Sequence, residues 1–191
     1  MTNYAKESAK LFGLHLVYAL VSLLFIGSFS FVVNHSLAAK IYSSVTALLY
    51  LSTVYSFAWQ AGRKDVRYAL MQNKHAPEAE WQRVSVWKGL WIGLLAAIPS
   101  VIMLCVFVHA SHTGGMYYVW VNMAYRMYQC SFLNWLGEDN FSYFWNCVIV
   151  TAIPPVTTAV AYFAGTKQFS VVERYLPALV YKKKKTNKTK S

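Results

Sequence analysis

Three residues of metal-binding type recur on one helical face near the middle of the chain. Cys105, His109 and His112 stand at i, i+4 and i+7, and sulfur and imidazole at such spacing could bind zinc or copper. No carboxylate or second thiol clearly completes a ligand shell beside them. We therefore interpret them as polar residues at the exit of a helix, and we expect no metal and no other cofactor.

Acid–base chemistry is scarce because charged residues are missing from four long stretches. The stretches 11–39, 41–62, 89–125 and 140–166 contain no Asp, Glu, Lys or Arg. Proton relays and ion-coupling sites in membranes usually need such residues, and the phosphate-loop, dinucleotide and nucleophile-elbow patterns are missing too. His15 is the only histidine inside a predicted span. The pattern predicts that the protein is not an enzyme.

Each uncharged stretch can hold about 20 apolar residues, which cross the roughly 30 Å hydrocarbon core of a bilayer as a helix. We predict an all-α integral membrane four-helix bundle with spans at about 11–33, 41–61, 89–108 and 144–164. The first apolar run exceeds the roughly 7–15 residues of a signal peptide, so we expect it to be retained. Residues 1–181 would form one transmembrane domain, and 182–191 a disordered polybasic tail.

The basic residues indicate how the chain is threaded. Of the 18 Lys and Arg residues, all but Lys40 and Arg126 lie in the N-terminal segment, the loop 62–88 or the tail. Because cytoplasmic loops retain positive charge, we expect a plasma-membrane protein with both termini in the cytoplasm.

The tail lysines give this basic side its most concentrated charge. We expect them to bind anionic lipid, each contributing about 1 kcal/mol near the membrane: Lys182, Lys183, Lys184, Lys185, Lys188 and Lys190. No nucleic-acid recognition fold accompanies the basic run, so we expect no nucleic-acid partner.

The outer loop, 109–140, carries an aromatic segment with helical periodicity. Its apolar and small residues recur at three- and four-residue steps: Tyr117, Trp120, Val121, Ala124, Tyr128, Ser131 and Trp135. We expect an amphipathic helix lying on the outer leaflet. A spanning helix over 115–136 would bury Arg126 at a cost of about 2.5–3.5 kcal/mol. The interfacial, re-entrant and spanning alternatives stay open.

Small residues predict where the helices approach each other. Gly89, Gly93 and Ala97 stand at four-residue spacing, and Ala161 and Gly165 form a second small-residue face. Such stripes let two backbones come close, which drives association in lipid. We expect contacts within the bundle, and a membrane-protein partner or a second copy of the chain is also compatible with them.

Prolines predict where the helices are interrupted. Pro99 should kink the third span, and Pro154 and Pro155 fall near the middle of the fourth, between Thr151 and Thr158. Two consecutive prolines remove two donors and release carbonyls about one turn earlier, which lipid cannot satisfy. We interpret this as a packed kink, although broken helices also form substrate sites in transporters.

Asp65 and the cysteines receive ordinary interpretations. Asp65 follows Arg63 and Lys64 at the inner mouth of the second span, and we expect a solvated loop carboxylate. Cys130 and Cys147 both fall toward the outer side. They could pair in an oxidising compartment, but we interpret them as small apolar residues.

Three short motifs carry a resemblance: Ala61-Gly62-Arg63-Lys64-Asp65, then Lys88-Gly89 with Gly93 and Pro99, and finally Pro155 with Ala161-Tyr162 and Gly165. In these motifs the chain resembles small uncharacterised membrane proteins of Gram-positive bacteria. The resemblance implies a bacterial plasma membrane and no particular activity. We therefore expect a non-enzymatic interaction or assembly protein. The alternative is a small transport component, such as a substrate-binding or permease-associated subunit of a larger transporter.

The threading can be tested with single cysteines. We predict that an impermeant thiol reagent labels a cysteine near Gly114 in intact cells and does not label one in the tail, because the basic segments stay in the cytoplasm. Labelling of the tail in intact cells would contradict this topology.

Overall fold

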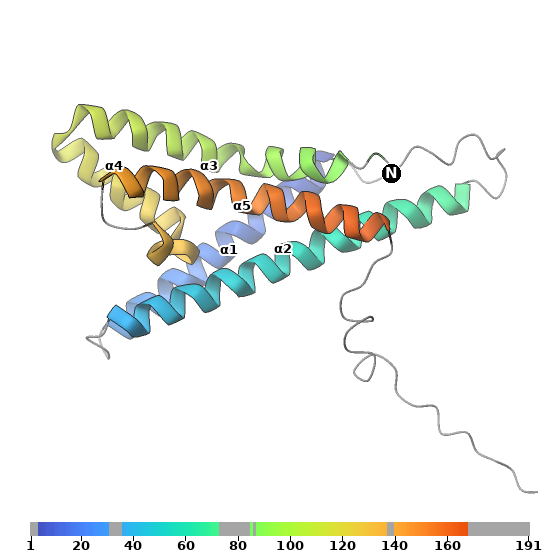
Figure 1. The fold of residues 1–191 in the computed structure, drawn as a ribbon, viewed down its shortest axis with the longest axis horizontal. Helices are drawn as coiled ribbons and strands as arrows, with labels where there is room; N and C mark the ends of the chain where they lie inside the picture. Colours follow the sequence, from blue (N-terminus) through green and yellow to red (C-terminus); the bar gives the residue numbers. More distant parts are fainter. Residues whose placement is uncertain (1–3, 31–35, 73–84, 86, 137–139, 168–191) are drawn as a thin grey trace, which may run out of the picture.

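The computed structural model describes residues 4–30, 36–72, 85, 87–136 and 140–167. The elements in these ranges are all helical (Figure 1): α1 Tyr4–Ser30, α2 Ser36–Gln72, α3 Lys88–Thr113, α4 Gly115–Tyr128, the 3₁₀ helix η3 Cys130–Trp135, and α5 Asn140–Thr166. The predicted all-α class is confirmed.

Four of these helices are long and apolar enough to cross a membrane. Their apolar segments are Tyr4–Phe25, Ile41–Ala69, Lys88–Thr113 and Phe144–Thr166. Each corresponds to one predicted span, so the structure is compatible with a multi-pass membrane protein.

Two helices extend well beyond their predicted spans. α1 begins at Tyr4 rather than Leu11, and α2 continues about three turns past Ala61 to Gln72. Charge ends an apolar run without ending a helix, because Lys and Arg are good helix formers. Predicted span residues 31–33 and the tail lysines lie outside the described residues.

The four long helices converge at one end of the bundle and diverge at the other. Figure 1 shows α1 and α2 separating from α3 and α5 toward the end where α3 meets α4. We call this the wide end. The narrow end holds the starts of α1 and α3 and the last turns of the apolar segments of α2 and α5.

The segment formed by α4 and η3 enters the space at the wide end. Tyr125, Phe132 and Leu136 are fully buried, and η3 packs against α1 and α2. Segment 115–136 is therefore mainly helical, but its second half lies inside the bundle. The expected position on the outer leaflet is corrected for this half, because these three residues, which lie off the predicted aromatic face, are buried in protein, whereas Trp120 of that face is 65 % exposed.

Two glycines make the reversal between α3 and α4. Gly114 and Gly115 have φ of +70° and +66°, a region in which side chains are strained and glycine is not. The N–H of Gly114 donates to the carbonyl of Ala110, which closes α3.

Small residues stand at the closest helix contacts. A Cβ at Gly93 of α3 would lie 2.9 Å from the Cα of Pro155 in α5, and one at Gly165 would clash with the backbone of Trp59 in α2. Gly89 lies against the ring and Cβ of Tyr162. α5 therefore packs closely on both of its neighbours.

The remaining predicted packing and proline positions lie in continuous helix. Ala97 and Ala161 are buried. α3 runs through Pro99, and α5 runs through Pro154 and Pro155. The prolines interrupt the hydrogen-bond ladder without ending either helix.

The Gly93 contact yields a stability prediction. Gly93→Leu should destabilise the protein by about 1–3 kcal/mol, the usual cost of overpacking, because the added side chain meets the α5 backbone. The measurement is thermal unfolding in mild detergent, with Leu94→Ile as the control at a 45 % exposed neighbour. Equal melting temperatures for both variants and the native chain would contradict the packing.

Candidate functional site

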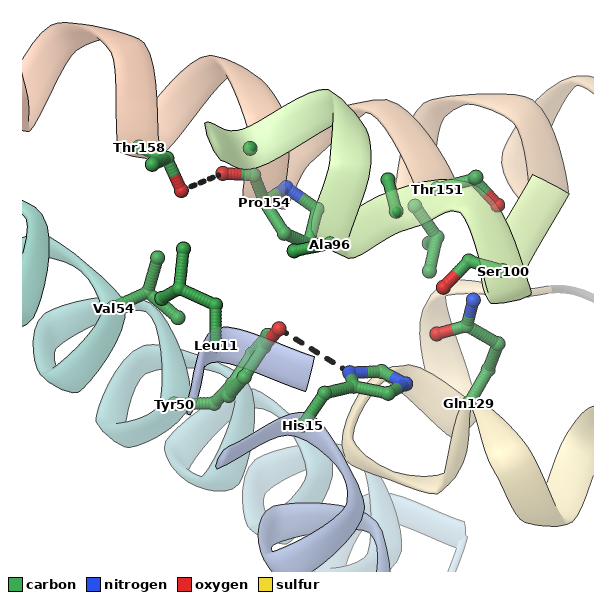
Figure 2. Close-up of a pocket in the computed structure, with 13 residues that line it drawn as sticks. Leu11, His15, Tyr50, Val54, Ala96, Ser100, Gln129, Thr151, Pro154 and Thr158 are labelled. Carbon is green, nitrogen blue, oxygen red and sulfur yellow. Dashed lines mark hydrogen bonds between the residues drawn. The ribbon is translucent and has the colours of Figure 1, made fainter. Parts of the chain in front are cut away.

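A small polar cavity lies in the middle of the bundle. Its volume is about 20 Å³, and its lining comes from α1, α2, α3 and α5 together with Gln129, which lies between α4 and η3. Gly93, Ala97 and Pro154 belong to the lining. The predicted packing stripe and the predicted helix interruption thus meet at one place (Figure 2).

His15 of α1 forms one side of this cavity. Its side chain is 6 % exposed, and its ring lies between the rings of Tyr50 and Tyr128, with centroids 5.5 and 4.7 Å away. The Nδ1 atom is 3.2 Å from the Tyr50 hydroxyl. The Tyr128 backbone also approaches the ring. Nε2 nevertheless has no hydrogen bond of good geometry to the described residues.

α5 forms the opposite side of the cavity. Pro154 and Pro155 carry no N–H, so the carbonyls of Val150 and Thr151 lack their usual i+4 donors. Both of these residues line the cavity. Thr158 donates its hydroxyl to the carbonyl of Pro154 at 2.8 Å, which is not one of the two carbonyls that the prolines release.

Ser100 and Gln129 complete the polar lining. The Ser100 hydroxyl lies 3.0 Å from the hydroxyl of Tyr128. Burial raises the pKa of Tyr128, which keeps this phenol neutral. Gln129 is 2 % exposed, and Figure 2 shows its amide on the side of the cavity faced by the second ring nitrogen of His15. The polar groups of the lining are neutral donors and acceptors, which suit a small polar molecule rather than an ion.

A second polar cluster joins the four long helices at the narrow end. Lys88 at the start of α3 pairs with Asp65 of α2, with Nζ and Oδ2 2.7 Å apart and side chains 8 % and 6 % exposed. Tyr162 of α5 donates its hydroxyl to the same carboxylate at 2.7 Å. Tyr4 of α1 places its ring 5.3 Å from the Lys88 ammonium.

The expectation of a solvated Asp65 is therefore wrong. α2 remains helical through this position, so Asp65 continues the face that the helix buries. The buried residues of that face recur at three- and four-residue steps: Ser43, Thr46, Ala47, Tyr50, Val54, Ala58, Ala61, Gly62 and Asp65. This periodicity was visible in the sequence and would have placed the carboxylate inside the bundle.

Part of each resemblance motif lies at the same end. A Cβ at Gly62 would contact the Tyr162 carbonyl and the Gly165 backbone, so α2 and α5 touch one helical turn before Asp65. Gly89 follows Lys88 and lies against Tyr162. Three segments far apart in the sequence thus form one contact region around the ion pair.

The other candidate residues remain apart from both clusters. Cys105, His109 and His112 are exposed at the end of α3, and within the described ranges no group of three or more His, Cys, Asp or Glu could hold a metal. Cys130 and Cys147 are both buried and carry thiols. Burial raises the pKa of the Cys130 thiol, which disfavours its reactive thiolate.

Comparisons of this chain with protein-family models, with curated proteins and with solved structures found no match.

The buried ion pair yields a prediction that separates pairing from simple polarity. Asp65→Asn should cost about 3–5 kcal/mol, because it leaves the Lys88 ammonium buried without its counter-charge. The double variant Asp65→Asn/Lys88→Met should recover most of this loss. Thermal unfolding in detergent measures both.

A matched control is the more exposed pair of Lys10 and Glu7, whose atoms are 3.2 Å apart. Because the Lys10 side chain is 47 % exposed, Lys10→Met should change the stability by less than about 1 kcal/mol. If the double variant is no more stable than Asp65→Asn alone, the two charges are not coupled and the assignment fails.

Proposed function

We propose that this chain is a multi-pass plasma-membrane protein that acts as a non-enzymatic interaction or assembly subunit. The observation that carries the proposal is the use of its polar side chains. Asp65 with Lys88 joins α2 to α3, and the hydroxyls of Tyr18 and Thr53, 2.7 Å apart, join α1 to α2. These groups hold helices together, and the central cavity between them is small, about 20 Å³.

The proposed threading puts the narrow end and both termini in the cytoplasm. The basic residues of α2 that follow the predicted end of its span at Ala61 support this orientation, since positive charge favours the cytoplasmic side. Arg63 lies over the ring of Trp59, 4.5 Å from its centroid, and Lys167 lies over Phe163 at 5.8 Å. Such pairs suit the headgroup level, where a cation stays wet and a ring stays half-buried.

In the same threading, the segment formed by α4 and η3 is re-entrant from the outer side. It leaves α3 at the wide end and returns to α5 at that end, so it does not cross. Ser131 of η3 supports the inward position, because its hydroxyl lies 3.1 Å from that of Ser22 in α1. The Nε of Arg126 donates to the amide oxygen of Asn122 at 3.3 Å, so the guanidinium charge has a polar neighbour.

The partner surface would lie on the outside of the bundle. α3 presents a continuous exposed apolar face: Trp91, Leu94, Leu95, Ile98, Val101 and Ile102. In a bilayer this face meets either lipid or another membrane helix. Both surroundings suit it, because lipid tails are as apolar as leucine. The basic tail would add adhesion to anionic lipid.

A transport component is the alternative function. Its support is the position of Pro154 and Pro155, because the two residues whose carbonyls they release, Val150 and Thr151, line a polar cavity next to His15. Transporters build substrate sites from interrupted helices of this kind.

Site-specific photo-crosslinking in the native membrane tests the proposal. A photoreactive residue at Ile98 on α3, at Leu48 on α2 or at Val160 on α5 probes three exposed faces. We expect one face to give a discrete protein adduct of fixed mass, either with a second copy of the chain or with one partner, and the other faces to give lipid adducts. Lipid adducts on all faces would contradict an interaction role. An adduct with an ATPase or permease would favour the alternative.

A further inference from the structure

We propose that the central cavity binds one water molecule, held between Nε2 of His15 and the side-chain amide of Gln129. This site goes beyond the proposed function and does not depend on it. The starting point is Nε2, the buried side-chain atom among the described residues that lacks a hydrogen-bond partner. An unsatisfied polar atom of this kind costs several kcal/mol in a surrounding without water.

The size of the cavity sets the size of its occupant. A volume of about 20 Å³ exceeds the roughly 10–15 Å³ that one water needs. It is far below the roughly 300–1,000 Å³ of pockets that bind drug-sized ligands. Buried waters also require two to four polar partners, and this lining offers them on several sides.

The hydrogen bond between His15 and Tyr50 explains why the occupant is water. If the Tyr50 hydroxyl donates to Nδ1, then Nε2 carries the proton and needs an acceptor. If Nδ1 donates to Tyr50, then Nε2 needs a donor. Water serves both tautomers, whereas a sodium or potassium ion serves neither well, because these cations prefer several oxygen ligands and the cavity lining contains no carboxylate.

α5 supplies further partners for the same molecule. The carbonyls of Val150 and Thr151 lack their i+4 donors because Pro154 and Pro155 carry no N–H, and both residues line the cavity. Ordered waters commonly satisfy the carbonyls that prolines release in membrane helices. A water bonded to Nε2 retains a hydrogen for one of these acceptors, so it would connect α1 to the interrupted turn of α5.

Gln129 gives the water a third connection. This residue lies where α4 ends and η3 begins, with φ −94° and ψ 26°. Its amide can both donate and accept. The proposed water therefore joins the inserted segment to α1 and α5.

The test is water-edited solid-state NMR on the full chain in lipid bilayers with ¹⁵N-labelled histidine. The chain has five histidines. The two ring-nitrogen resonances that are lost in His15→Phe are those of His15. We expect magnetisation to pass from water to Nε2 of His15 at short mixing times. Nδ1 should show much weaker transfer, because it faces Tyr50.

Two variants with the same added volume control the measurement. Ala96→Leu fills the cavity from α3 and should abolish the transfer to His15. Ala152→Leu adds the same three carbons at an exposed position of α5 and should leave it intact. An unchanged His15 signal in Ala152→Leu also shows that the bundle tolerates the added volume.

Two results with the unaltered protein and one with Ala96→Leu would overturn the proposal. Absence of transfer to Nε2 would show a dry cavity. A His15 shift that depends on exchanging sodium for lithium would show a bound cation instead of water. Transfer that persists in Ala96→Leu would mean that water reaches the ring by another route, and the site as described would be wrong.

Discussion

The ion pair between Asp65 and Lys88 is the constraint on which the rest of the bundle depends. Two charges withdrawn from water require good mutual geometry and additional hydrogen bonds, and here the four long helices supply them. Tyr162 donates a hydrogen bond to the Asp65 carboxylate, and the ring of Tyr4 lies against the Lys88 ammonium. Glycines beside these residues allow the close approach that the pair demands, since a side chain at Gly62 or Gly89 would separate α5 from its neighbours. With the narrow end fixed in this way, the helices diverge, and the segment formed by α4 and η3 occupies the space between them.

Much of this architecture could be predicted from the sequence because lipid tolerates so few alternatives. A long stretch without charge has to become a helix in a bilayer, so the four long helices were predictable. The extension of α2 was not, because we took Arg63 and Lys64 as the end of the helix as well as the end of the span. Asp65 was misplaced for the same reason. The buried half of 115–136 was missed because its buried aromatic residues, Tyr125 and Phe132, lie off the periodic face, and aromatic side chains suit a lipid interface and a bundle interior equally well.

The central cavity could not have been derived from local sequence. Each part of it was visible: a lone histidine in the first span, a small-residue stripe in the third and a pair of prolines in the fourth. These parts meet only because the helices have a particular register relative to one another. The contacts at the narrow end set this register. The role of Gln129 could not be predicted, because a glutamine in an outer loop is expected to face solvent unless the loop is known to turn inward. The chemistry of this protein therefore lies in tertiary contacts rather than in motifs.

The length of α2 has a mechanical consequence. This helix continues from Asp65 to Gln72, about two turns or roughly 10 Å, and its outer residues Arg67, Tyr68 and Met71 are exposed. A helix is stiff over this distance, and the ion pair anchors it at Asp65. The projecting turns therefore form a lever with its fulcrum at the ion pair. A load applied to its tip would tilt the long arm of α2, which carries Tyr50 and thus reaches the ring of His15.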